Sequence, residues 1–170
     1  VTQNNNFAPS YAKASIDINN SIVKTLGANA IALVSVLSTA GNTSDSSIAV
    51  HGTSIVETSG ASSTGISASS QSGLAKVSVD EGAQVLTHGA NSHAVVATSN
   101  QAAGGVVVTN AGTIVSDQYD GINAIGRNAG TTIINSGNVT GGKNGIYAEN
   151  KGSGVIAITQ SAGSIIGKTQ

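Results

Sequence analysis

The chain has 170 residues, a formal net charge of −1, 22 glycines and no cysteine. Its length fits one domain, and its nearly balanced charge offers no electrostatic footprint for the phosphates of a nucleic acid. The absence of cysteine excludes disulfides and thiolate metal sites, and no apolar run is long enough to span a bilayer.

The N-terminal residues 1–14 are rich in asparagine and contain the only proline, Pro9. They predict a loop or a cap over the repeats that follow. No basic segment followed by an apolar one opens the chain, so we expect any signal peptide to have been removed. The remaining residues, 15–170, are predicted to form a repeat domain that stops partway through a repeat, and we expect the full-length protein to continue beyond it.

From residue 15 onward, one cassette of short aliphatic blocks recurs. It reads Ile48-Ala49-Val50, then a glycine turn leading to Ile55, then the block at residues 65–68. A spacing of two between aliphatic residues is the period of a strand with one buried face. Glycine, asparagine, serine and aspartate between the blocks favour turns. The cassette therefore predicts three short strands in each repeat.

The aliphatic residues align in columns, and in the first column the successive members are 24 to 32 residues apart. The first column is Ile18, Val50, Val79, Val108, Ile134 and Ile158. The second is Ile22, Ile55, Val85, Ile114, Val139 and Ile165. The third is Ile31, Ile66, Val95, Ile122 and Ile146, followed two residues later by Leu33, Ala68, Ala97, Ala124 and Ala148. Because the steps shorten along the chain, we expect a loop-rich N-terminal end, with a long connector at residues 37–47, and a lean C-terminal end.

This pattern predicts an all-β, right-handed parallel β-helix of about five coils. Coils of such a solenoid hydrogen-bond to their neighbours at about 4.8 Å, and several must stack to bury their aliphatic side chains. Parallel crossovers favour the right-handed form. A helical solenoid fits poorly because weak helix formers dominate. A propeller blade would need about 40 residues and an aromatic signature.

The C-terminal cassettes carry a resemblance to a known family. Residues 111–114 followed by 120–124, and residues 135–139 followed by 145–148, resemble the repeats of bacterial autotransporter (type V secretion) passenger domains. The resemblance covers roughly residues 15–167 and implies a right-handed β-helix. In size and in general sequence character the chain is similar to the compact passengers of the alphaproteobacterial angiogenic-factor autotransporters.

The resemblance implies a protein that is secreted or displayed on the bacterial cell surface, exported through an outer-membrane barrel that is absent from this sequence. We therefore expect a virulence or adhesion module that binds a host cell-surface protein or receptor without catalysis or cofactor. A growth-factor-like, pro-angiogenic receptor agonist is one form of it. A self-associating adhesin for bacterial aggregation and a carbohydrate-active β-helix enzyme remain alternatives.

The enzyme alternative depends on His88, Asp117 and Asp120. His88 and Asp117 are 29 residues apart, which is one coil, so they are expected to be neighbours. A carboxylate beside a histidine can perform acid–base chemistry, and paired carboxylates can cleave glycosidic bonds. The same residues also fit solvated turns, because Asp120 precedes a glycine. No serine-hydrolase nucleophile motif occurs in the chain.

A second histidine and aspartate are also expected side by side. His51 and Asp80 occupy matching positions on successive coils in the first column, with Thr109 following them. Asp80 with Glu81 falls short of a calcium cage, which needs more converging oxygen ligands. The histidines show no zinc-ligand spacing, so we expect no metal site.

The binding hypothesis depends on exposed side chains near the C-terminal end. Tyr147 should point outward because Ile146 points inward, and Tyr119 precedes a turn glycine. Tyrosine and arginine often anchor interfaces, although scattered exposed side chains need no partner. The partner-binding candidates are Tyr119, Asp120, Arg127, Lys143, Tyr147 and Lys151. The connector at residues 37–47 is the competing site, because long loops on rigid scaffolds often carry function.

Overall fold

The computed structural model describes residues 1–4, 13–39 and 41–168, which form 18 strands and no helix. The strands make three parallel sheets, named A, B and C here. Sheet A contains β1 (Thr2–Asn4), β4 (Leu33–Leu37), β7 (Ile66–Ser70), β10 (Val95–Ser99), β13 (Ile122–Gly126) and β16 (Ile146–Asn150). Sheet B contains β2 (Ala14–Asn19), β5 (Ser46–His51), β8 (Leu74–Val79), β11 (Gly105–Asn110), β14 (Thr131–Asn135) and β17 (Ile156–Gln160). Sheet C contains β3 (Ile22–Thr25), β6 (Ile55–Thr58), β9 (Gln84–Thr87), β12 (Thr113–Ser116), β15 (Asn138–Gly141) and β18 (Ser164–Gly167).

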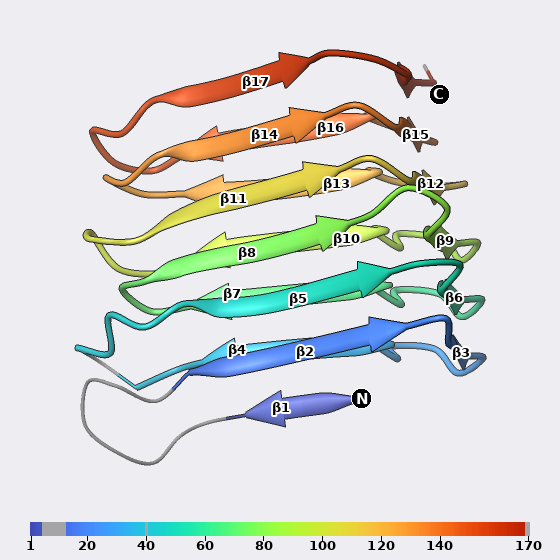
Figure 1. Ribbon diagram of the computed structural model, residues 1–170, viewed down its shortest axis with the longest axis horizontal. Helices are drawn as coiled ribbons and strands as arrows, with labels where there is room; N and C mark the ends of the chain where they lie inside the picture. The colour runs from blue at the N-terminus through green and yellow to red at the C-terminus, as the bar shows by residue number, and fades with distance from the viewer. Residues whose placement is uncertain (5–12, 40, 169–170) are drawn as a thin grey trace.

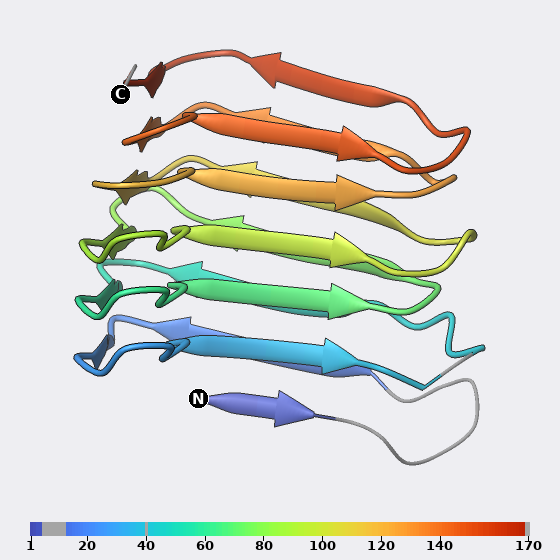
Figure 2. The same cartoon turned by 180° about the vertical axis from the view of Figure 1, so that it is seen from behind.

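Each coil passes through sheets B, C and A in that order, and every strand pairs in parallel with its equivalent in the next coil. In Figure 1 the chain crosses the front in β2, β5 and β8 and returns behind in β4, β7 and β10, rising toward the C-terminus. Figure 2 shows the sheet A strands from the other side. The molecule is therefore a right-handed parallel β-helix of about five coils, as the repeat predicts.

The interior is lined by aliphatic side chains that alternate with outward-facing residues along each strand. In β5, for example, Ile48 and Val50 are buried while Ala49 is half-buried. Stacking places each inward residue on its equivalent one coil away. No coil has enough apolar surface to fold alone, so the columns hold the solenoid together.

The observed registers correct the first predicted column. Val79 pairs with Asn110, and Val108 instead stacks on Val77. Ile133 takes the place predicted for Ile134, whose exposed fraction is 43%. The buried column is Ile16, Ile48, Val77, Val108 and Ile133, continued by Ile158.

The second and third columns need correction only in the first two coils. Val23 and Val56 face inward instead of Ile22 and Ile55, because the register joins Val56 to Val85. The third column begins at Leu33, which pairs with Ile66, while Ile31 lies before the strand. Ser35 consequently occupies the place predicted for Leu33, beside Ala68. The other members of both columns pair as predicted.

A ladder of amide side chains replaces the aliphatic column in the last three strands of sheet B. The column Ile18, Val50 and Val79 continues as Asn110, Asn135 and Gln160. Asn110 Nδ2 donates to Asn135 Oδ1 at 2.7 Å, and Asn135 Nδ2 donates to Gln160 Oε1 at 2.7 Å. Asn110 and Asn135 are both fully buried. Because both of these asparagines have hydrogen-bond partners, the ladder avoids the cost of an orphaned polar group.

The turns shorten along the chain as predicted. The turn from sheet C to sheet A covers residues 59–65 and 88–94 in earlier coils but only 142–145 in a later one. Tight stacking of these turns requires glycine, because a Cβ on Gly89 would collide with the carbonyl of Gly60. The connector between β4 and β5 includes residue 40, which lies outside the described residues.

At the N-terminus, β1 extends sheet A by pairing with β4, with Thr2 beside Val34. Of the rest of the predicted cap at residues 1–14, residues 5–12 with Pro9 lie outside the described residues, and Ala14 is the first residue of β2. Among the residues that the structure describes, none belongs to a helix long and apolar enough to cross a membrane.

Candidate functional site

A hollow of about 300 Å³ lies on the outer face of sheet A, in the two coils that contain β13 and β16. We call it the Tyr119 pocket. It is lined by Tyr119, Asp120, Asn123, Ile125, Lys143, Tyr147 and Glu149. Its floor comes from outward positions of paired strands, where Asn123 lies beside Tyr147 and Ile125 beside Glu149. Its wall comes from the short turns that follow β12 and β15.

The wall is held together by an aromatic cluster. Lys143 Nζ lies 4.6 Å from the centre of the Tyr119 ring and donates to its hydroxyl at 3.3 Å. His93, from the coil before, packs edge-on against the same ring at a centroid distance of 4.6 Å. A cation over an aromatic face is attracted by the ring's negative charge density. Tyr119 is therefore fixed by side chains from the coils on both sides.

Asp120 is the buried carboxylate of the pocket, with an exposed fraction of only 3%. Asn144 Nδ2 donates to its Oδ1 at 2.7 Å, and Asn123 Nδ2 approaches its Oδ2 at 3.5 Å. His93 Nδ1 lies 3.3 Å from Oδ2, but it lacks the alignment of a hydrogen bond. Burial lowers the pKa of the His93 imidazole, although Asp120 acts in the opposite direction. Asp120 thus links two turns and a strand beneath the pocket.

The open side of the pocket is formed by β16. Tyr147 points outward, with 41% of its surface exposed, as the inward position of Ile146 predicts. Its hydroxyl donates to Glu149 Oε2 at 3.3 Å, and the negative charge of Glu149 raises the pKa of the phenol. Lys151 Nζ lies 3.8 Å from the same carboxylate oxygen.

Four of the six predicted partner-binding residues therefore line the pocket: Tyr119, Asp120, Lys143 and Tyr147. Lys151 reaches it only through Glu149. Arg127 does not line it and lies in the turn after β13, where it forms an isolated bridge with Gly130. Its Nε is buried without a hydrogen-bond partner among the described residues.

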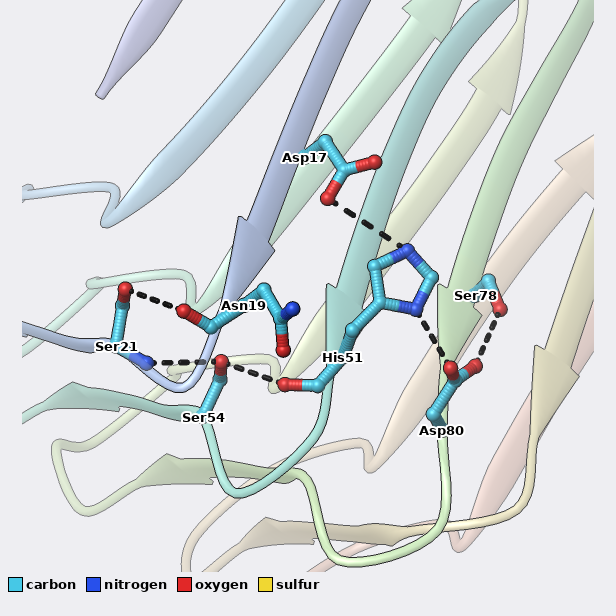
Figure 3. Close-up of polar contacts among 7 residues, drawn as sticks. All are labelled: Asp17, Asn19, Ser21, His51, Ser54, Ser78 and Asp80. Atoms are coloured by element: carbon cyan, nitrogen blue, oxygen red, sulfur yellow. Dashed lines mark hydrogen bonds and ion pairs between the residues drawn. The ribbon is translucent and has the colours of Figure 1, made fainter.

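A row of one imidazole between two carboxylates crosses the outer face of sheet B. His51 Nδ1 lies 2.6 Å from Asp80 Oδ2, and His51 Nε2 lies 3.6 Å from Asp17 Oδ1. Figure 3 shows the imidazole between the two carboxylates, with Ser78 donating to Asp80. The predicted neighbourhood of His51 and Asp80 is confirmed, whereas Thr109 pairs with Ser78 and does not continue the row.

A second row lies at the end of sheet C. His88 Nδ1 is 2.8 Å from Asp117 Oδ2, and His88 Nε2 is 3.6 Å from Glu57 Oε1. Lys24 extends this row by binding Glu57 at 2.7 Å. The predicted pairing of His88 with Asp117 is confirmed. Asp120, the third residue of the enzyme hypothesis, is instead buried against Asn144 and His93.

The functional chemistry of either row is limited by its geometry. Both histidines lie between carboxylates on exposed faces, which is the arrangement of a surface ion pair. Within the described residues, no group of three or more histidine, aspartate and glutamate side chains could hold a metal ion. In the Tyr119 pocket, by contrast, aromatic, amide and charged groups converge around a volume that a ligand could enter.

Sequence reasoning named the tyrosines and the lysine but missed Asn123, Ile125 and Glu149. The signal was present, because the third column aligns Ile122 with Ile146 correctly. Outward residues one and three positions later must then be neighbours in the same way.

Comparison of the chain with family models, with curated proteins and with solved structures found no match in any of the three.

Proposed function

We propose that this protein is a secreted or surface-displayed adhesion module that binds a receptor on a host cell through the Tyr119 pocket, without catalysis. The observation that carries the proposal is the convergence of Tyr119, Lys143 and Tyr147 around one hollow on a rigid face. Aromatic side chains in a preformed hollow are typical of binding hot spots. The finer proposal, an autotransporter passenger of the angiogenic-factor type, is supported by the β-helical fold and the cassette resemblance alone.

Rigid display is the mechanism that we propose. The strands β13 and β16 are fixed by their parallel pairing, and the turn residues are fixed by Asp120 and the aromatic cluster. Side chains held in this way lose little conformational freedom when a partner binds. The solenoid thus acts as a support that fixes the contact residues before the encounter.

The test is the binding of labelled protein to cultured host cells. Tyr147→Ala and Lys143→Ala should each weaken binding, because they remove exposed contact groups without entering the interior. Thr43→Lys, in the connector between β4 and β5, is the matched change at the competing site and should leave binding unchanged. If Thr43→Lys abolishes binding and the pocket variants do not, the contact lies at the N-terminal end.

A further inference from the structure

The lining of the Tyr119 pocket combines the kinds of chemical group that can contact a bound sugar. Tyr147 and Ile125 supply apolar surface, Asn123 supplies an amide, and the remaining lining residues carry hydroxyl, carboxylate and ammonium groups. Sugar rings present apolar C–H faces and a rim of hydroxyls that both donate and accept hydrogen bonds. Tyrosine suits such a ligand because its ring is apolar and its hydroxyl is polar.

One polar atom of the lining has no partner. Asn123 Oδ1 is buried and accepts no hydrogen bond among the described residues, while its Nδ2 is directed at Asp120. A buried acceptor without a donor is rare in folded proteins. Because this oxygen has almost no accessible surface, a ligand hydroxyl can reach it only when the Asn123 side chain turns toward the pocket, and that hydroxyl would then supply the missing donor. Asn123 is therefore the polar contact that we assign to the ligand.

The charges of the pocket are already engaged within the protein. Asp120 accepts from Asn144, and Glu149 accepts from Tyr147 and approaches Lys151. The only lining cation, Lys143, lies over the Tyr119 ring. An anionic ligand would meet two carboxylates, and a cationic one would have to displace existing partners. The balance therefore favours a ligand without charge.

Resting on the function proposed above, we propose that the part of the receptor that enters the Tyr119 pocket is a neutral glycan. Its sugars carry neither carboxylate nor sulfate. A sugar ring packs on the exposed ring of Tyr147, and a sugar hydroxyl donates to Asn123 Oδ1. The volume of about 300 Å³ is at the lower limit of ligand pockets, which run from about 300 to 1,000 Å³, so the pocket takes the end of a glycan chain.

The experiment measures binding of the purified protein to an array of neutral oligosaccharides with hexose ends and to their sialylated and sulfated counterparts. Neutral members should bind, and their charged counterparts should bind less. Tyr147→Ala should weaken binding roughly three- to tenfold, the usual range for an aromatic contact, whereas Tyr147→Phe should retain most of it. Leu26→Ala, a change at an exposed apolar residue in the turn after β3, should have no effect.

A second measurement separates this inference from the proposed function. Host cells are treated with glycosidases, and binding of the labelled protein is compared before and after. Loss of binding supports the glycan. Binding that survives deglycosylation but is lost in Tyr147→Ala overturns the glycan and leaves the adhesion function standing. The glycan is also overturned if the protein binds a lysine-rich peptide and binds none of the neutral oligosaccharides. If the protein binds glycans but does not bind intact cells, the adhesion function alone is overturned.

Discussion

The buried amide ladder predicts a strong coupling between Asn110 and Asn135. Asn135→Val removes the acceptor of Asn110 Nδ2, whose other contacts, to the carbonyls of Gly112 and Asn138, are long at 3.4 and 3.5 Å. An orphaned buried donor costs about 1–3 kcal/mol, and the added apolar burial returns roughly 1 kcal/mol. We expect a net loss of about 1–2 kcal/mol in the free energy of unfolding. Asn110→Val should cost a similar amount.

The double variant Asn110→Val, Asn135→Val removes both partners and continues the valine column of Val50 and Val79. Replacing both members of a buried hydrogen bond by apolar groups is nearly neutral. The remaining loss is that of the local bonds to the turns, such as Asn135 Nδ2 to the carbonyl of Gly137. The double variant should therefore be more stable than the sum of the single changes predicts, by at least about 1 kcal/mol.

The assay is equilibrium unfolding in urea, followed by far-ultraviolet circular dichroism, for the wild type and the three variants. Val50→Asn is the matched control, because it places an asparagine in the same column between Ile18 and Val79, where neither neighbour can bond to it. It should cost about 2–4 kcal/mol. Additivity within about 0.5 kcal/mol would refute the reasoning, since it would mean that the two amides do not depend on each other.

Three further changes test other parts of the molecule. Val79→Asp should unfold the protein, because the side chain is buried and an unpaired carboxylate there is costly; a retained thermal transition would place Val79 outside the core. His51 has a pKa raised by its hydrogen bond to Asp80, so its contribution is present below the unfolded value of about 6.5 and is lost as pH rises through the raised pKa. His51→Gln should thus destabilise the protein by at most about 1 kcal/mol at pH 5 and hardly at all at pH 9; a cost that grows with pH contradicts the assignment. The double change of His88 and Asp117 to alanine should leave cell binding intact, and loss of a measured glycan-cleaving activity in it would establish an enzyme.

The fold could be predicted from the sequence because the same pattern of aliphatic residues and turns recurs in each coil and packs in the same way. Several of the wrong column assignments fall where two aliphatic residues are adjacent, as in Ile55-Val56 and Ile133-Ile134. A strand alternates with period two, so a shift by one residue reverses every side chain, and composition does not say which neighbour faces inward. Val56 and Ile133 face inward because their pairing partners do.

The amide ladder was missed for a different reason. An aliphatic residue does not occupy this column in every coil, so matching by residue type pairs Val79 with Val108 where the register pairs it with Asn110. The sequence held the signal, because Asn110 and Asn135 each stand two residues before a glycine, at equivalent turns. A polar residue in a core column is expected only when the next coil supplies its partner.

For the candidate site, the sequence predicted which side chains point outward but not how they converge. Tyr147 follows from the alternation within one strand. The burial of Asp120 depends on His93 and Asn144, which come from different coils and lie in turns of different length. The alternation of side chains along a strand does not determine the conformation of the turns. The convergence of these residues into a pocket therefore could not be predicted from the sequence.

The pocket lies across two coils that follow one another in the chain and pair through β13 and β16. Tyr119 and Tyr147 line the pocket from two successive coils, so a bound ligand would connect layers that otherwise separate one at a time. Solenoids lose structure from their ends, and a ligand that binds only the folded state opposes this fraying. Amide hydrogen exchange should therefore slow in β13 and β16 when the pocket is occupied, while the first two coils exchange as before. Occupation of the pocket would in this way stabilise the solenoid at the coils that the ligand contacts.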